Sequence, residues 1–339
     1  MKKRIGILAA GCMAAAGAAT GDLKPVSIRE EFGGGRGQYT YAPSPVELKD
    51  GTQLVFFCQN ENPFTVIDSI FLAEGKTPPG GKQLRWKRPK LVLSPPKRGW
   101  DNVHICDPDV RMLAGVYNGK SFSWVMTYLG VAQKDCNNNE IGLAFAKTPA
   151  GPWTKFDANP IVKAPDPAYW GAGQTSSIVT GEASMDMYYT KATAQGSRVY
   201  RRSVDFQKDG TVKIGEEAMI PGLRRNASVA RSEKFYYAAM PLEGHAPGTE
   251  PPVSKSLALV RIPASEDITN PSARWEEIGQ ITPQDTNSPR NHNAGLLTDP
   301  RGWIKDDNTI TVYFSVGKEG DGWLWTYTLY SALFKPQSP

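Results

Sequence analysis

The sequence has few of the residues that build metal and redox sites. Its 339 residues include only four cysteines and three histidines. No CxxC pair occurs, and the 48 and 30 residues that separate Cys58, Cys106 and Cys136 do not match the spacing of a structural zinc site. We therefore expect no metal site built from these residues and no cofactor. A calcium or sodium ion in a central channel would leave no trace in the sequence.

The chain also lacks a strong excess of charge. It carries 39 basic and 34 acidic residues, and no stripe of basic residues stands out, so we expect no nucleic-acid partner. It lacks a membrane span as well, because its longest apolar run is shorter than the roughly 20 residues that cross a bilayer.

That apolar run lies at the N-terminus and has the pattern of an export signal. Lys2, Lys3 and Arg4 precede an apolar stretch, and Ala16 and Ala18 flank Gly17 in a small-residue cleavage site. We predict that residues 1–20 are a signal peptide and that the protein is exported, to the periplasm or as a secreted protein. Its removal leaves 36 basic and 34 acidic residues.

Cys12 ends the sequence LAAGC, which resembles a bacterial lipoprotein box. The alternatives are an ordinary signal peptide and a lipid anchor on Cys12. The mature chain keeps three cysteines, which allows one disulfide and one free thiol in an oxidising compartment. The pairing cannot be deduced from the sequence.

A helical hydrophobic stripe is missing from the mature chain, which predicts an all-β protein. After a glycine-rich approach over residues 22–42, one pattern recurs five times: an apolar strand, a polar turn and an aromatic-rich strand. The repeats start 64, 68, 51 and 67 residues apart, at Pro43, Asp107, Thr175, Asn226 and Asn293. This spacing suits blades of four strands with variable loops.

We therefore predict a five-bladed β-propeller that forms a single domain over residues 21–339. A β-sandwich is the alternative, but it would not explain five repeats. Trp86, Trp153 and Trp275 recur before the last strand of a repeat and are expected in the core.

The innermost strand of each blade lines the central channel, so the residues that start these strands should converge at one channel mouth. These residues are Pro43, Ser44, Asp107, Asp109, Gln174, Ser176, Asn226, Ser228, His292 and Asn293, and the approach loops add Trp100, His104, Trp170, Arg225 and Arg290. Carbohydrate sites combine such aromatic faces with Asp, Asn, Gln and Arg side chains that read hydroxyl groups. We expect an oligo- or polysaccharide as the partner.

Residues 104–162 carry a family resemblance. HICDPDV, WVMTYLG, NEIGLAFAKTPAGPW and NPIV resemble the second blade of the five-bladed propeller glycosidases, particularly glycoside hydrolase family 43 and its relatives. The resemblance implies a glycoside hydrolase that acts on glycans containing arabinose, xylose or similar sugars. It also implies that Asp107 is the blade-two aspartate, which orients substrate and tunes the pKa of the general acid.

Two positions depart from the family pattern. The resemblance implies a base aspartate at the start of blade one, where this chain has APSPV, and an acid glutamate at the start of blade three, where it has Gln174. An amide cannot donate a proton at neutral pH, so the usual pair for glycoside hydrolysis is incomplete.

Asp109, two residues beyond Asp107 on one strand, could share acid and base work with it. His292 could act as the acid from the opposite wall, and Glu61 and Glu243 are further carboxylates near strand ends. We therefore predict Asp107, Asp109 and His292 as catalytic residues. The predicted substrate-binding residues are Trp100, His104, Trp170, Gln174, Arg225, Asn226, Arg290 and Asn293. The alternatives to a glycosidase are a propeller that binds glycans without catalysis and a scaffold without a sugar site.

Overall fold

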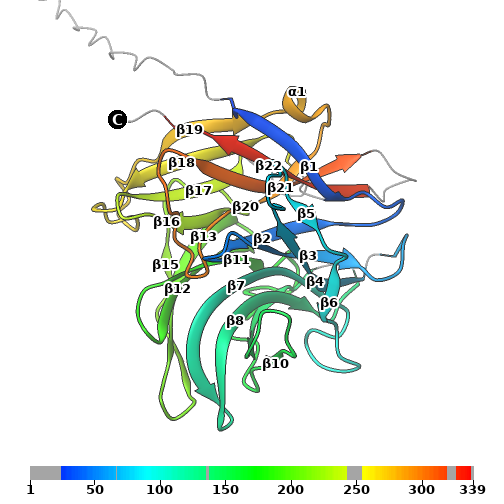
Figure 1. Cartoon of the computed structure of the whole chain (residues 1–339). Helices are drawn as coiled ribbons and strands as arrows, with labels where there is room; N and C mark the ends of the chain where they lie inside the picture. Colours follow the sequence, from blue (N-terminus) through cyan, green and yellow to red (C-terminus); the bar gives the residue numbers. More distant parts are fainter. Residues whose placement is uncertain (1–23, 66, 135–136, 243–253, 319–325, 337–339) are drawn as a thin grey trace, which may run out of the picture.

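The computed structural model describes residues 24–65, 67–134, 137–242, 254–318 and 326–336. In these residues the chain is β-structure apart from short turns and one helix, α1 (Pro283–Thr286). The strands form five separate antiparallel sheets arranged as the blades of a propeller (Figure 1). The predicted all-β, five-bladed fold is confirmed. The predicted signal peptide, Cys12, Cys136 and Glu243 lie outside the described residues.

Blades I to III follow one another along the chain, each from its innermost strand outward. Blade I contains β2 (Tyr41–Glu47), β3 (Gln53–Asn60), β4 (Asp68–Lys76), β5 (Arg85–Trp86) and β6 (Lys90–Leu93). Blade II contains β7 (His104–Tyr117), β8 (Lys120–Val131), β9 (Glu140–Ala146) and β10 (Thr154–Lys155). Blade III contains β11 (Ala172–Val179), β12 (Ser184–Thr193), β13 (Gly196–Phe206), β14 (Val212–Ile214) and β15 (Ala218–Met219).

Blades IV and V complete the ring. Blade IV contains β16 (Ser228–Arg231), β17 (Phe235–Pro241), β18 (Leu257–Pro263) and β19 (Glu276–Ile281). Blade V contains β20 (Asn291–Leu296), β21 (Ile310–Lys318), β22 (Thr326–Phe334) and β1 (Ser27–Gly33). The innermost strands contact one another in the circular order β2, β7, β11, β16, β20 and back to β2.

The N-terminal strand β1 closes this ring. It pairs antiparallel with β22, so the first and last strands of the chain lie side by side as the outer strands of blade V (Figure 1). The glycine-rich approach over residues 22–42 was expected only to lead into the first blade, but Ser27–Gly33 form a strand of blade V instead. The sequence SIREEFG alternates weakly and is largely exposed, which is the pattern of an edge strand.

Apolar side chains fill the spaces between neighbouring blades. One cluster joins blades II and III, where the rings of Phe145 and Phe206 lie 5.9 Å apart. Equivalent clusters join the other pairs of blades, and Trp86, Trp153 and Trp275 pack against three of them. These tryptophans were predicted to lie in the core; all three are partly buried and pack at its edge.

Each innermost strand turns at one residue in the left-handed backbone region. These residues have φ between 44° and 58°, and they are Ala42, Asp107, Gln174, Asn226 and Asn293. In the four blades other than IV, the strand register breaks at this residue, which makes it a β-bulge that re-aims the side chain. We call the end of the channel where these five residues meet the channel mouth.

Hydroxyl groups link the blades just inside the mouth. The Val110 N–H donates to Oγ of Ser44, and the matching N–H groups of Val229 and Leu296 donate to Oγ of Ser176 and Ser228. In each case the hydroxyl belongs to the preceding blade, two residues beyond its left-handed residue. Such bonds satisfy buried backbone donors that no strand can reach.

The corresponding hydrogen bond between blades V and I is missing, because one residue has no donor and the other has no hydroxyl group. The residue that should donate is Pro45, which has no N–H, and the residue that should accept is Gly295. A Cβ atom on Gly295 would lie 2.1 Å from the carbonyl oxygen of Pro43. The glycine therefore lets the two backbones approach where no hydrogen bond can form.

The loop between β20 and β21 closes the end of the channel opposite the mouth. Its carbonyl groups at Thr298, Pro300, Arg301 and Gly302 accept hydrogen bonds from the N–H groups of Glu47, Met112, Val179 and Arg231, one from each of the other four blades. Gly302 lies so close to blade III that a Cβ atom would approach the Ser177 carbonyl oxygen to 2.3 Å. This loop thus ties the four other blades together at this end of the channel, and we call residues 298–302 the plug.

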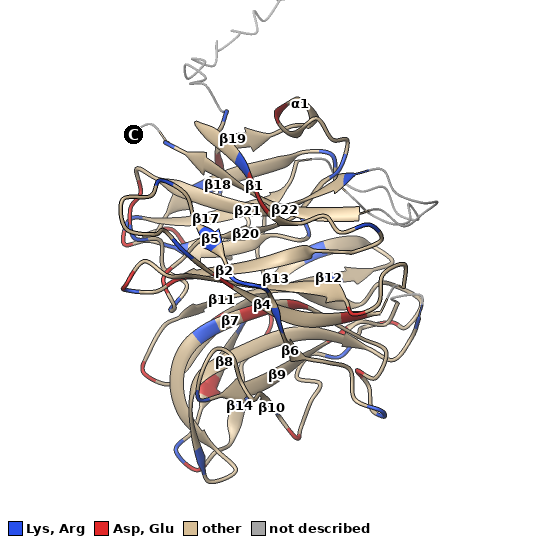
Figure 2. Cartoon of the chain, turned by 45° about the vertical axis from the view of Figure 1, so that its right-hand side comes forward, with Lys and Arg blue, Asp and Glu red and all other residues tan. Residues whose placement is uncertain are grey.

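Charges of both signs are interspersed over the blades (Figure 2), and no large surface of a single sign dominates this view. No helix in the described part of the chain is long and apolar enough to span a membrane.

Candidate functional site

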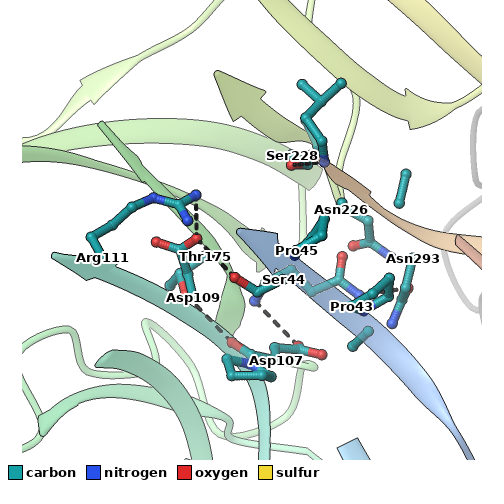
Figure 3. Close-up of a pocket in the computed structure, with 17 residues that line it drawn as sticks. Pro43, Ser44, Pro45, Asp107, Asp109, Arg111, Thr175, Asn226, Ser228 and Asn293 are labelled. Carbon is teal, nitrogen blue, oxygen red and sulfur yellow. Dashed lines mark hydrogen bonds and ion pairs between the residues drawn. The ribbon is translucent and has the colours of Figure 1, made fainter. Parts of the chain in front are cut away.

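The channel mouth leads into a small polar cavity. The five left-handed residues all line it, together with the first residues of the innermost strands (Figure 3). The cavity has about 40 Å³ of room for the centres of water molecules. That is enough for a few waters and too little for a sugar ring.

Asp107 is the carboxyl group of the mouth itself. Its side chain is only 6% exposed, and its Oδ2 accepts a hydrogen bond from the Gln174 N–H at 3.2 Å. Burial raises the pKa of Asp107 to about 7, against the effect of this hydrogen bond, and the nearby Asp68 carboxylate raises it further. Burial therefore favours the protonated form of Asp107.

A second buried carboxylate, Asp68, lies close enough to Asp107 for its charge to act on it. It opens β4 and is 3% exposed, and its Oδ2 accepts a hydrogen bond from the Tyr41 hydroxyl at 2.9 Å. The Asp68 N–H donates to Nδ1 of His104 at 3.3 Å. His104, predicted to contact substrate, is buried and instead joins β7 to β4.

Sequence reasoning missed Asp68 and Tyr41. Tyr41 directly precedes the left-handed residue of blade I, and Asp68 starts the third strand of that blade. An acidic residue at the start of an otherwise apolar strand was the available signal. Its pairing with Tyr41 depends on how the strands of blade I align.

A disulfide between Cys58 and Cys106 supports Asp107 from below. It joins β3 of blade I to β7 of blade II. The Asp107 N–H donates to Sγ of Cys58 at 2.9 Å, and Sγ of Cys106 lies 3.3 Å from Oδ1 of Asp107 and 3.2 Å from the Tyr41 hydroxyl. The disulfide therefore holds Cys106, the residue that directly precedes Asp107, in place.

Asp109 lies deeper in the channel than Asp107 and faces the Arg111 guanidinium group. The bulge at Asp107 separates the two side chains, and Asp109 forms an ion pair with Arg111, whose Nη2 lies 2.6 Å from Oδ1 (Figure 3). Burial raises the pKa of Asp109, and the charge of Arg111 opposes this rise. The Nε of Arg111 also donates to the Ser177 carbonyl at 2.6 Å, so the pair is held between blades II and III.

His292 lies beside the mouth in blade V, half-buried, with its ring 6.5 Å from that of Tyr327. Burial and the charges of Arg225 and Arg290 lower the pKa of His292 to about 3. The imidazole is therefore neutral at pH 7, which disfavours its use as a proton donor. Its Nδ1 is buried without a hydrogen-bond partner among the described residues.

Amide side chains fill the positions across from Asp107. The Nε2 of Gln174 donates to Oδ1 of Asn293 at 2.9 Å, which joins blade III to blade V at the mouth. Asn226 is held by a bond from its N–H to Oγ1 of Thr190 at 2.7 Å. Ala42, in blade I, offers no polar side chain. All five mouth positions are thus defined, and only one of them carries a carboxyl group.

Aromatic side chains form one side of the rim. Trp170 and Tyr41 are partly exposed and pack against the disulfide and Leu129. The rings of Tyr39 and Tyr327 lie 5.9 Å apart and continue this arc toward His292. Tyr327 is buried, whereas the partly exposed rings of Trp170, Tyr41 and Tyr39 lie beside polar groups and are suited to stack on the apolar face of a sugar.

Trp100 belongs to the interior of blade II instead. Its ring stacks on Tyr128 at 5.8 Å and covers Gly130 and Gly142, where a Cβ atom would collide with it. It does not line the cavity of the mouth.

The remaining candidates lie away from the mouth or outside the described residues. Glu61 is exposed and accepts hydrogen bonds from the hydroxyls of Ser69 and Ser94. Among the described residues, the only three metal-ligating side chains close together are those of Cys58, Cys106 and Asp107. Both sulfur atoms belong to the disulfide, so they do not form a thiolate metal site.

Comparison with known proteins shows what the fold resembles. No family model and no curated protein matches the sequence. Among solved structures, a family 117 glycoside hydrolase of Zobellia galactanivorans matches with a TM-score of 0.58 and 12% identity, over 92% of this chain and 91% of that one. A thermostable family 43 glycoside hydrolase matches with a TM-score of 0.55 and 14% identity, over 91% and 96%.

The α-L-arabinofuranosidase PaAbf62A of Podospora anserina, solved with cellotriose, matches with a TM-score of 0.54 and 12% identity, over 93% of this chain and 96% of that one. The molecule is therefore a five-bladed propeller with the fold of glycoside hydrolases. The predicted resemblance to the family 43 enzymes and their relatives is confirmed at the level of the fold.

Proposed function

We propose that this protein is an exported glycoside hydrolase that binds arabinose- or xylose-containing oligosaccharides at the channel mouth, with Asp107 as the proton donor. One observation carries the proposal: of the five left-handed residues at the mouth, only Asp107 has a carboxyl group, and its burial raises its pKa to about 7. A general acid works best when its pKa lies near the operating pH. The similar folds were solved with sugars such as xylotriose, which supports a glycan as the ligand.

The rest of the mouth divides binding from proton transfer. Gln174, Asn226 and Asn293 would hydrogen-bond the sugar hydroxyls, and Trp170 and Tyr41 would stack on the ring. Asp68 would accept the proton of the attacking water through the Tyr41 hydroxyl, which already donates to it at 2.9 Å. Asp107, Asp109 and His292 were the candidates for the proton donor. Asp109 is paired with Arg111, and the low pKa of His292 keeps its imidazole neutral, so we assign proton donation to Asp107.

Asp107→Asn tests the acid. Hydrolysis of arabino- or xylo-oligosaccharides should fall by about 100-fold or more, since general acid catalysis typically contributes that much. The loss should be smaller for a dinitrophenyl glycoside, because its leaving group needs no proton. In the wild type, kcat/KM should decline as the pH rises through about 7, where Asp107 loses its proton.

Asp209→Asn, an exposed turn carboxylate, is the control and should keep full activity. Equal losses with both leaving groups would argue that Asp107 orients the sugar instead of protonating it. Unchanged turnover would exclude the assignment.

A glycan-binding protein without catalysis is the second candidate. It is favoured by Ala42 and Gln174, which stand where the family resemblance implies the base and the acid. Calorimetry would then show sugar binding without turnover in both the wild type and Asp107→Asn. The double variant Ala42→Asp/Gln174→Glu supplies both missing carboxyl groups, and a gain of hydrolysis in it alone would favour this second function.

A further inference from the structure

The outer edge of blade I carries a long run of positive charge. Residues 75–100 contain eight basic and no acidic residues, although the formal net charge of the whole chain is only +5. They form the end of β4, the outer strands β5 and β6, and the loops on either side of these two strands (Figure 2). The expectation that no stripe of basic residues stands out is therefore wrong for this edge.

Most of these charges have no counter-charge. Lys76 forms an ion pair with Asp50, and Lys87 forms one with Glu74. The other six are exposed and, within the described part of the chain, form no ion pair and no side-chain hydrogen bond: Lys82, Arg85, Arg88, Lys90, Lys97 and Arg98. We call these six residues the basic edge. Like charges held along one strand repel one another in the folded protein, and a bound anion relieves this repulsion.

The basic edge runs along blade I from the far end of the channel to the mouth side. β5 pairs with the end of β4, and β6 pairs with its start, close to Asp68. The charge of Asp68 acts on Asp107 at the mouth. The loop that carries Lys97 and Arg98 follows β6, so it leaves the blade on the mouth side. The charges therefore form a single row, about one strand wide.

Protection of an edge strand does not explain the sign of this charge. Charged side chains and prolines such as Pro89 keep an outer strand from pairing with another molecule. The outer strands of blades IV and V carry glutamates instead, at positions 276 and 277 in β19 and at 30 and 31 in β1. Blade I differs because one sign extends over its outer strands and both flanking loops, which indicates an anionic partner.

We propose that the basic edge binds a linear anionic polysaccharide, with carboxylate or sulfate groups, at a site separate from the channel mouth. A row of charges matches a linear polymer better than it matches the plane of a membrane. Sites for single-stranded nucleic acid add exposed rings on which bases stack, whereas Trp86 in this row packs against Phe32 at 4.8 Å. The need for an anionic polymer follows from the charges alone, and the choice of a polysaccharide rests on the proposed function.

Binding at this edge would also serve the mouth. A polymer held along blade I has its neighbouring segments close to the mouth, which raises their effective concentration there without a new contact. The two arginines of the row that lie on or beside β5, Arg85 and Arg88, can each pair with both oxygens of a carboxylate.

Matched polymers test the charge. Calorimetry at low ionic strength compares polygalacturonate with the same polymer after methyl esterification, and dextran sulfate with dextran. The wild type should bind at least one charged polymer about tenfold tighter than its uncharged counterpart, since several exposed charge contacts contribute roughly two- to fivefold each. This preference should shrink at high salt. The two pairs of polymers distinguish a carboxylate from a sulfate.

Double variants assign the preference to the basic edge. Arg85→Gln/Arg88→Gln should lose about fivefold of the affinity for the charged polymer and keep the affinity for the uncharged one. Arg198→Gln/Lys213→Gln removes the same charge from exposed positions of blade III and is the control, which should bind like the wild type. All four side chains are exposed, so neither double variant should alter the free energy of unfolding by much.

Equal affinity of the wild type for charged and uncharged polymers, or equal losses in both double variants, would overturn the inference. Tighter binding to vesicles of anionic lipid or to duplex DNA than to either charged polysaccharide would overturn the choice of partner. These titrations involve no turnover. Their failure would leave the proposed function standing, and failure of the hydrolysis tests on Asp107 would leave the binding of an anionic polymer standing.

Discussion

Asp107 combines properties that seldom occur in one residue. It adopts a left-handed backbone, which Asp tolerates better than most residues, and it is buried between a disulfide and an amide. Its carboxyl group is consequently held near a pKa of about 7. Such perturbed groups in clefts mark functional sites more often than structural ones.

The raised pKa of Asp107 predicts a pH-dependent stability. The folded state binds this proton more tightly than the unfolded state, so the stabilisation is complete below the ordinary pKa of 3.8 and is lost as the pH rises through about 7. The Asp107→Asn variant has no carboxyl group at this position, so it does not lose this stability as the pH rises. Between pH 5 and pH 8 its free energy of unfolding should therefore gain about 2 to 3 kcal/mol relative to the wild type. Urea unfolding at both pH values measures the gap, and a constant gap would contradict the raised pKa.

The sequence was informative about Asp107 and uninformative about its surroundings. The DPDV motif, at the start of an apolar strand, predicted a mouth position. Asp109 looked equivalent because residues two apart on a regular strand share a face, but the bulge at Asp107 breaks that alternation. The contact of Tyr41 with Asp68 bridges separate strands, and no local pattern encodes it.

At the scale of elements, the five innermost strands share one design. Each turns at a left-handed residue and then meets the next blade two residues later. Strand order could be predicted from the repeats, because apolar and aromatic runs recur with each blade. In blade I the predicted mouth residue was Pro43, one residue beyond the left-handed Ala42 that the structure shows. Alanine gives no sign of a left-handed backbone in the sequence.

Ser228→Ala tests the hydroxyl links between blades. It removes the acceptor for the Leu296 N–H, which the structure places 3.1 Å away in a partly buried contact between blades IV and V. Leaving that donor unsatisfied should lower the free energy of unfolding by about 1 to 3 kcal/mol. Ser265→Ala, on an exposed turn of blade IV, is the control and should be near neutral. Equal stability of both variants in urea would mean that water replaces the hydroxyl.

For the whole molecule, three connections hold the ring closed: the pairing of β1 with β22, the disulfide between blades I and II, and the plug that bonds to four blades. The number of blades followed from the sequence repeats. The closing strand did not, because an exposed edge strand has little hydrophobic pattern, and the plug did not, because its bonds come from backbone carbonyl groups that any residue supplies.

Removal of the disulfide should destabilise the whole ring. Cys58 and Cys106 are 48 residues apart, and the chain-entropy model gives about 4 kcal/mol for a loop of that length. The double variant Cys58→Ala/Cys106→Ala should therefore unfold at lower urea, with a loss approaching this value. A reducing agent should lower the wild type to the level of the variant and leave the variant unchanged. If reduction left wild-type stability unaltered, the cross-link would contribute nothing to folding.

The pairing of β1 with β22 also affects the order in which the parts of the protein can fold. Blade V takes its outer strand from Ser27–Gly33 and its other strands from residues 291–334, so a chain that lacks either segment cannot complete this blade. Contacts so distant in sequence form slowly. The pairing of β1 with β22 is therefore expected among the last contacts to form, after those between strands that are neighbours in the sequence.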